Sequence, residues 1–246
     1  MEKLIILGST SNICANRVFN NLNNLNYFKT IICYGYEKWT TDDFITKHFF
    51  KNVVLKNKNK ISKKIKFISG EYNLESYRKN LLKFVTNNTI IYVSTPPICY
   101  TDILNFNKIL LEKINLNLIL EKPLCLNLDE YQCINKLLEK NVIVSDHFIY
   151  KNDIIKLFNY KEEIKKIEVH FLYTDDVENR LGYFDKVGFF LDMFQSHFMS
   201  IIYKINDSLI SKDLKIKKNI RKRYENYGGK NNIDTYFYVE YLINGV

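Results

Sequence analysis

The chain has 246 residues, of which 46% are hydrophobic, 15% aromatic and 26% charged. This length can bury a core without disulfides, and the composition excludes both intrinsic disorder and a small disulfide-stapled scaffold. No apolar run approaches the roughly 18 to 20 residues of a membrane span, and the first residues do not resemble a secretion signal. We therefore expect a folded, cytoplasmic protein that does not bind membranes.

The charge balance is basic, because 36 Lys and Arg against 27 Asp and Glu give a net charge of +9. The densest basic runs, 56–67 and 212–224, carry few aromatic residues of the kind that stack on nucleic-acid bases. We interpret both runs as solvated surface and expect no nucleic-acid partner. The five cysteines form no C-x-x-C pair, so the sequence predicts neither a disulfide framework nor a metal site.

Short apolar runs alternate with helical patterns through the first 150 residues. The run at 4–8 meets Gly8, a Ser/Thr/Asn cluster and then apolar residues at helical spacing, which predicts strand, tight turn and helix. Further strands are predicted at 29–34, 89–95, 117–120 and 142–145, with helices at 100–113 and 127–140. This order predicts an α/β fold, a Rossmann-like doubly wound parallel sheet, over residues 1–150.

The pattern changes after residue 150. Residues 165–173 and 232–243 alternate apolar and polar side chains, as half-exposed antiparallel strands do. An apolar helix is predicted between them, at 188–203. We therefore expect a second, smaller α+β domain with a reduced antiparallel sheet over 151–246.

Two motifs lie at ends of predicted strands, where an open α/β sheet binds its ligand. In the turn GSTSNICANR, backbone N–H groups at a helix N-terminus could bind the phosphates of a dinucleotide. Only Gly8 of the usual glycine fingerprint is present, so the turn alone fits an ordinary strand-to-helix connection equally well. The three prolines are more specific, because Pro96, Pro97 and Pro123 all follow predicted strands. A proline there can hold a fixed turn, in cis or trans.

Titratable residues follow the later strands. Lys122 could donate a hydrogen bond to a substrate hydroxyl or carbonyl. Asp146 and His147 follow the next strand, and His197 lies on the apolar helix five residues after Asp192. Histidine is the natural base near neutral pH, and a carboxylate partner fixes its tautomer. A lone helical histidine is more often a core residue, so the candidate rests on this combination.

The order of these motifs resembles the glucose-6-phosphate dehydrogenase family over almost the whole chain. GSTSNICANRVF aligns with the family's nucleotide turn without a gap, STPP and EKP stand in the family's places, and VSDHFIYK resembles its R-I-D-H-Y-x-G-K. The most specific match is ENRLGYFDKVGFFLDMFQSHF. The residues that keep family type and register there are Glu178, Arg180, Gly182, Tyr183, Asp185, Gly188, Asp192, Gln195 and His197.

This resemblance implies oxidation of a sugar phosphate, such as glucose 6-phosphate, at C1 to the lactone, with NADP or NAD as cofactor, in the pentose phosphate pathway. It implies that His197 is the base, that Asp146 orients it and that Lys122 binds the reacting oxygen. The substrate-binding residues would be His147, Lys151, Glu178 and Asp192. The cofactor-binding residues would be Gly8, Ser9, Thr10, Ser11, Asn12, Ile13, Glu37, Thr95, Pro96, Pro97 and Lys122. Whether the protein forms a homo-oligomer is left open.

The chain also departs from the family pattern. In this chain Ser11, Cys125 and Tyr150 stand where the family has glycines, Phe148 stands where it has a tyrosine, and Leu191 stands where it has an arginine. Where the family has an arginine after the second strand, this chain has Tyr36 and Glu37. A carboxylate accepts from a ribose 2′-hydroxyl and repels a 2′-phosphate, so we expect NAD to be at least competitive with NADP. The sequence ends before the family's W-x-G-V-P-F and R-x-G-K motifs, so we expect a truncated second domain.

Two alternative interpretations stay open. A shorter sugar oxidoreductase similar to the Gfo/Idh/MocA family would share the nucleotide domain and the EKP turn, but it would not explain the match over 178–197. A degenerate, non-enzymatic binding relative would explain the truncation. It would not explain why Lys122, Asp146 and His197 are retained together. If the chain is an enzyme, we expect Asp146 and His197 to form a hydrogen-bonded or water-bridged pair at the mouth of the cofactor crevice, with Lys122 within reach.

Overall fold

A computed structural model describes residues 3–22, 27–111, 114, 116–158, 185, 187–205, 214–222 and 236–243. The chain divides into two compact units, 1–145 and 146–246. The division falls directly after the last strand of the first unit, a few residues before the boundary at 150 that the sequence predicts. Asp146 is therefore the first residue of the second unit.

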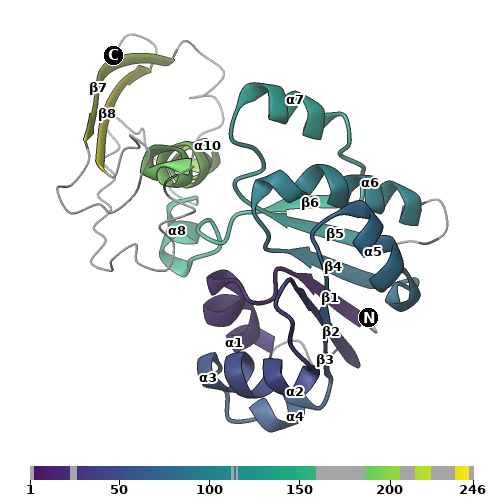
Figure 1. The fold of residues 1–246 in the computed structure, drawn as a ribbon. Helices are drawn as coiled ribbons and strands as arrows, with labels where there is room; N and C mark the ends of the chain where they lie inside the picture. Colours follow the sequence, from purple (N-terminus) through teal and green to yellow (C-terminus); the bar gives the residue numbers. More distant parts are fainter. Residues whose placement is uncertain are drawn as a thin grey trace. The chain divides into compact units, whose positions relative to one another are not determined.

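The first unit is built on a six-stranded parallel sheet in the order β3-β2-β1-β4-β5-β6 (Figure 1). The strands are β1 (Lys3–Leu7), β2 (Thr30–Gly35), β3 (Ile65–Ser69), β4 (Thr89–Val93), β5 (Leu116–Glu121) and β6 (Val142–Ser145). The predicted Rossmann-like sheet is thus confirmed. The strand order reverses between β1 and β4, and sheets of this type bind their ligand at such a reversal.

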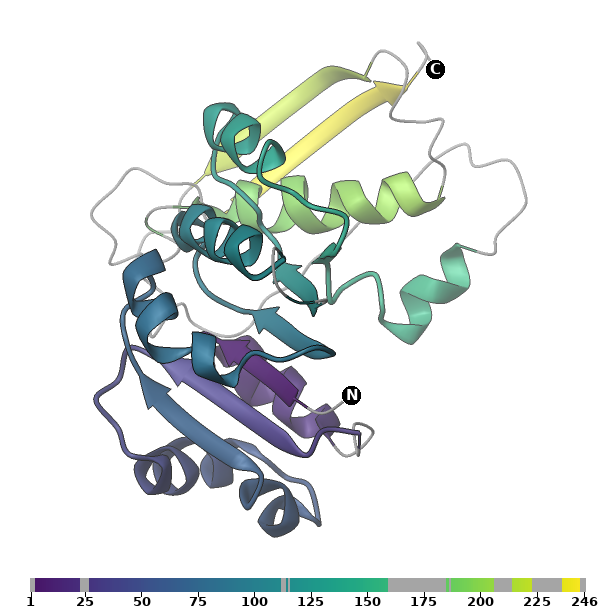
Figure 2. The ribbon, with the colours of Figure 1, turned by 90° about the vertical axis from the view of Figure 1, so that its right-hand side faces the viewer.

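Helices cover both faces of this sheet (Figure 2). Those on one face are η1 (Cys14–Val18), α1 (Phe19–Asn21), α2 (Thr41–Phe44), η3 (Ile45–Phe49), α3 (Phe50–Asn52) and α4 (Lys58–Ser62). Those on the other face are α5 (Leu74–Asn80), η4 (Leu82–Phe84), η5 (Pro97–Cys99), α6 (Tyr100–Leu111) and α7 (Leu128–Asn135).

The strand side chains alternate between two hydrophobic clusters. Ile5 and Leu7 of β1 join the cluster beneath α5 and α6, whereas Leu4 and Ile6 join the cluster beneath α1 and α2. Burial on both faces explains why the central strands are continuous apolar runs. Strand β3 was not predicted, because Lys66 interrupts it and is exposed between buried neighbours. The interpretation of 56–67 as solvated surface holds for the exposed lysines of the run. Lys58 and Lys64 are instead half-buried and donate to backbone carbonyls, and the interpretation misses this strand.

The second unit contains α8 (Asn152–Leu157), the consecutive helical segments η7 (Phe190–Phe198) and α10 (Met199–Ile205), and an antiparallel pair, β7 (Leu214–Lys222) and β8 (Tyr236–Ile243). Phe237 and Val239 of β8 pack against Phe194 and Phe198 of η7. The predicted helix and the strand within 232–243 are confirmed, while 165–173 lies outside the described residues. Strand β7 was not predicted, since its run of lysines was interpreted as surface.

The described helices include none that is both long and apolar enough to cross a bilayer.

Candidate active site

The turn after β1 is held against the ends of two other strands. Gly8 adopts φ +76°, in the left-handed region, and a side chain there would clash with the carbonyl of Ser94. The N–H groups of Gly8 and Ser9 both donate to the carbonyl of Tyr34, at 3.0 and 3.1 Å. The turn therefore lies where β1, β2 and β4 end together, at the reversal of strand order.

Ser11 stands in the place of a fingerprint glycine and bonds the turn to the end of β4. Its Oγ lies 2.7 Å from Ser94 Oγ and accepts the N–H of Cys14 at 3.2 Å. Burial raises the pKa of the Cys14 thiol to about 11, so the thiol is protonated at neutral pH. The serine therefore replaces the glycine's flexibility with two hydrogen bonds.

The other predicted cofactor residues lie along the same edge. Within the turn, Thr10 and Ile13 are half-buried and Asn12 is exposed. After β4, Thr95 and Pro97 are buried and Pro96 is exposed. The Ser94 N–H donates to the carbonyl of Leu7 at 2.8 Å, which fixes the STPP segment beside the Gly8 turn.

Glu37 supplies a carboxylate at the end of β2. Its side chain folds back over Gly35, so that Oε2 lies 2.6 Å from the place a Cβ of residue 35 would occupy. Oε2 is buried and has no hydrogen-bond partner among the described residues. A carboxylate here is the acceptor that a ribose hydroxyl uses in dinucleotide-binding sheets. The Gly8 turn and this unsatisfied oxygen together fit a dinucleotide cofactor.

The EKP segment follows β5. Glu121 is 4% exposed and accepts a hydrogen bond from the Tyr92 hydroxyl at 2.6 Å. The Lys122–Pro123 peptide bond is cis, and the Lys122 N–H donates to the carbonyl of Ser145 at 3.2 Å. These contacts fix the backbone that carries the Lys122 ammonium. Because Lys122 belongs to the first unit, its predicted approach to His197 stays a prediction.

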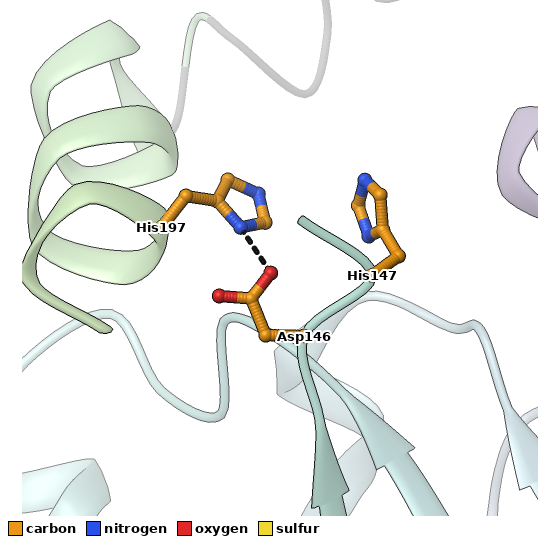
Figure 3. Close-up of side chains that lie close together, drawn as sticks. All are labelled: Asp146, His147 and His197. Carbon is orange, nitrogen blue, oxygen red and sulfur yellow. Dashed lines mark hydrogen bonds and ion pairs between the residues drawn. The ribbon is translucent and has the colours of Figure 1, made fainter. Parts of the chain in front are cut away.

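Asp146 and His197 form the buried hydrogen-bonded pair that the sequence analysis expects (Figure 3). His197 Nδ1 lies 2.6 Å from Asp146 Oδ1, and the two side chains are only 5% and 4% exposed. The Phe148 N–H also donates to Asp146 Oδ1, at 2.9 Å, which orients the carboxylate. Since an ionised carboxylate only accepts, His197 carries its proton on Nδ1 and keeps Nε2 as its basic nitrogen.

Two aromatic neighbours surround the His197 ring. The His147 ring meets it edge-on, with centroids 5.1 Å apart, and Phe148 lies against it at 4.2 Å and an interplanar angle of 30°. The Lys151 ammonium lies 3.8 Å from the centroid of the Phe148 ring. His147 and Lys151 therefore lie beside the Asp146–His197 pair, and together they could bind an anion.

Asp146, His147 and His197 could also be considered as metal ligands, since one ligand atom from each lies within 4.8 Å of the others. The hydrogen-bonded atoms of Asp146 and His197 are 2.6 Å apart. Two ligand atoms on a tetrahedral zinc, with bonds of about 2.0 to 2.1 Å, would lie about 3.3 Å apart. We therefore interpret the cluster as a proton-transfer group.

The remaining predicted substrate residues are Asp192 and Glu178. Asp192 is buried on η7, the helix that also carries His197, and its N–H donates to the carbonyl of Gly188 at 3.2 Å. Glu178 lies outside the described residues.

Two family models match consecutive parts of the chain. Residues 5–155 match the family model described as "Glucose-6-phosphate dehydrogenase, NAD binding domain", and residues 147–208 match the one described as "Glucose-6-phosphate dehydrogenase, C-terminal domain". The chain belongs to the glucose-6-phosphate dehydrogenase family. This match favours the family over the shorter sugar oxidoreductases considered above, and it makes NADP or NAD the cofactor.

Several curated relatives are similar over part of their length. A glucose-6-phosphate 1-dehydrogenase of Borreliella burgdorferi is 27% identical over 173 residues, 61% of this chain and 35% of that protein. One from Buchnera aphidicola subsp. Baizongia pistaciae is 31% identical over 58% of this chain and 34% of its own length. One from Helicobacter pylori is 26% identical over 86% of this chain and 55% of its own length. The chain thus matches between a third and a little over half of these glucose-6-phosphate dehydrogenases.

Solved structures of the family share the fold. A glucose-6-phosphate 1-dehydrogenase from Mycobacterium avium superposes with a TM-score of 0.75 at 17% identity, covering 98% of this chain and 66% of that one. A glucose-6-phosphate dehydrogenase in complex with glucose 6-phosphate gives a TM-score of 0.72 at 18% identity, covering 99% of this chain and 65% of that one.

Ser94 is not among the site residues predicted from the sequence, although its side chain joins the nucleotide turn to the end of β4. Ser94 is signalled by its place at the start of STPP.

Proposed function

We propose that this chain oxidises the C1 hydroxyl of a sugar phosphate resembling glucose 6-phosphate to the lactone, with NADP or NAD as oxidant. The observation that carries the proposal is the buried Asp146–His197 pair in a chain of the glucose-6-phosphate dehydrogenase family. His197 Nε2 takes the proton of the C1 hydroxyl, and Asp146 holds the tautomer and stabilises the imidazolium. A nicotinamide cofactor held at the Gly8 turn would supply the oxidising chemistry, as the acceptor of the C1 hydride.

The other site residues bind the sugar. His147 and Lys151 hold the phosphate, since an imidazole donor and an ammonium both pair with that anion. Lys122 donates to the reacting oxygen, and Asp192 and Glu178 accept hydrogen bonds from ring hydroxyls. The Gly8 turn binds the cofactor's pyrophosphate through its backbone N–H groups.

The test measures absorbance of the reduced nicotinamide with a panel of hexose phosphates and free sugars against both cofactors. We expect turnover with a hexose phosphate, and we expect His197→Asn to lower kcat by about 10² to 10⁴ while cofactor binding is kept. His147→Asn is the matched variant, and it should raise KM for the phosphate ester more than it lowers kcat.

Two results would contradict the proposal. Turnover confined to free sugars would favour the shorter sugar oxidoreductases. Cofactor binding without turnover of any sugar would favour the non-enzymatic binding relative.

A further inference from the structure

The phenyl ring of Phe148 contacts three proposed site residues at once. Its centroid lies 4.2 Å from that of the His197 ring, at an interplanar angle of 30°. The centroid of the His147 ring lies 4.9 Å away, and the Lys151 ammonium lies 3.8 Å from the phenyl centroid. The two imidazoles come from different elements, the turn after β6 and the helix η7 (Figure 3). One apolar side chain therefore connects the proposed base to both proposed phosphate ligands, and all four residues belong to the second unit.

The backbone of Phe148 is held on both sides. Its N–H donates to Asp146 Oδ1 at 2.9 Å, and its carbonyl accepts the Lys151 N–H at 3.1 Å. The ring is half-buried and packs against the buried apolar residues of η7. These contacts fix the place from which the ring reaches its polar neighbours.

The ring restrains the His197 imidazole in a direction that its hydrogen bond does not. A hydrogen bond at Nδ1, such as the one to Asp146, acts in the plane of the imidazole. The last side-chain torsion of a histidine is broad, so this bond alone lets the ring turn about it. The phenyl face lies within 30° of parallel to the imidazole and opposes that rotation. The two contacts together set the direction of Nε2, the nitrogen that the proposed function uses as the base.

The same ring restrains the Lys151 ammonium, which is carried by an exposed side chain. An ammonium within about 6 Å of a phenyl centroid is attracted by the quadrupole of the ring. This contact steadies a flexible four-carbon stem and brings no negative charge with it, so the ammonium can still pair with a phosphate. Because the contacts to Lys151 and to His197 are measured from one centroid, the ring limits the separation between the ammonium and the imidazole.

We propose that Phe148 is a positioning residue, whose ring directs His197 Nε2 and holds the Lys151 ammonium at a limited distance from it. The inference rests on the proposed function, since it takes His197 as the base and Lys151 as a phosphate ligand. Its consequence is specificity. The ring favours a substrate whose phosphate reaches Lys151 while its C1 hydroxyl meets Nε2, whereas a free hexose uses only the second of these contacts.

The test compares two variants of the whole chain. Phe148→Leu removes the ring but keeps an apolar side chain, and Phe148→Tyr keeps the ring. The matched control is Phe190→Leu, because Phe190 packs on the same apolar cluster and stacks on Phe194, with centroids 5.0 Å apart. Calorimetry without cofactor gives the dissociation constant of glucose 6-phosphate, and absorbance of the reduced nicotinamide gives kcat.

We expect Phe148→Leu to bind glucose 6-phosphate about three- to tenfold more weakly, because the cation–π contact to Lys151 is lost. Its kcat should fall by about tenfold, because Nε2 of His197 is no longer directed. Phe148→Tyr and Phe190→Leu should stay within about threefold of the wild type in both quantities. A merely structural role would lower the stability of both leucine variants and leave these two quantities alike.

A measurement on the wild type decides the matter if Phe148→Leu does not fold. Protons above the face of a phenyl ring are shielded, so the ring protons of His197 and the ε-methylene protons of Lys151 should resonate upfield of their ordinary positions in proton NMR. The chain has four histidines, and His197→Asn identifies the signals of this one. Ordinary chemical shifts for both groups would overturn the inference.

Equal dissociation constants and equal kcat in the wild type and in Phe148→Leu overturn the inference and leave the proposed function intact. An equal loss in Phe148→Tyr and Phe148→Leu also overturns it, because the ring is present in one of them. A wild type that oxidises no sugar phosphate overturns the proposed function, and the inference falls with it. The failures are therefore distinguishable.

Discussion

At the scale of single residues, the short contact between Asp146 and His197 orders the candidate site. The carboxylate accepts from both the His197 ring and the Phe148 backbone, so it fixes one tautomer of the histidine. The family resemblance predicted that the two residues pair, although they are 51 positions apart and meet only through the fold of the second unit, whereas the 2.6 Å distance between them comes from the structure.

Asp146→Asn should keep the position of His197 but remove the charge that stabilises the imidazolium. We expect kcat for the sugar phosphate to fall by about 10² or more, with KM nearly unchanged. The matched control is Asp153→Asn, since Asp153 is exposed on α8 and contacts only Lys156 among the partners that the structure describes. Steady-state kinetics that show equal rates for the two variants would contradict the assignment of Asp146.

Gly8→Ala tests the cofactor turn. The substitution forces a side chain into the left-handed region and against the Ser94 carbonyl, so we expect a loss of about 1 to 3 kcal/mol in the free energy of unfolding. Asn12→Ala, in the same turn but exposed, should stay within about 0.5 kcal/mol of the wild type. Urea titration followed by circular dichroism distinguishes the two.

At the scale of elements, the central strands could be predicted and the lysine-rich ones could not. β1 and β2 are apolar on both faces because helices cover the sheet on both sides, and such runs are visible in the sequence. Lys66 of β3 and Lys218 of β7 are exposed while their backbones pair with neighbouring strands, so composition there reports exposure of side chains and not the backbone conformation. The short helices of 41–52 are not predicted from the sequence.

The helix that carries His48 begins with a capping box. The Thr40 hydroxyl accepts from the Asp43 N–H at 3.1 Å, while the Asp43 carboxylate accepts from the Thr40 N–H at 3.1 Å. Thr40→Ala should therefore destabilise the chain by about 1 kcal/mol. Thr46→Ala, later in the same helical run and bonded only to carbonyls of the preceding turn, is the control and should cost less. Chemical denaturation measures both, and equal losses would mean that the cap contributes nothing.

At the scale of the whole molecule, the two units divide the candidate functions. The first contains the Gly8 turn and Glu37, and the second contains Asp146 and His197. Because the division falls after Ser145, Asp146 follows the last strand of the sheet but belongs to the same unit as the proposed base, His197. The sequence predicts a change of domain near residue 150, because apolar and alternating strand patterns differ on its two sides.

Cofactor binding should stabilise the whole chain against heat. A ligand at 100 times its dissociation constant stabilises the native state by about 2.7 kcal/mol, so NAD or NADP should raise the Tm measurably. The Gly8→Ala variant serves as the control, because its displaced turn should bind the cofactor weakly and show a smaller rise. Differential scanning calorimetry with and without each cofactor measures the effect, and an unchanged wild-type Tm would argue against binding.

The buried thiol beneath the Gly8 turn has a consequence for covalent chemistry. A cysteine reacts as its thiolate, and with a pKa of about 11 Cys14 is almost entirely in the unreactive form. Burial likewise raises the pKa of Cys33, whereas Cys133 on α7 is exposed. Electrophiles and mild oxidants should therefore leave the Cys14 thiol untouched, and a maleimide dye should react first at the exposed Cys133 rather than at the half-buried Cys99 beside Pro97, whose pKa burial also raises.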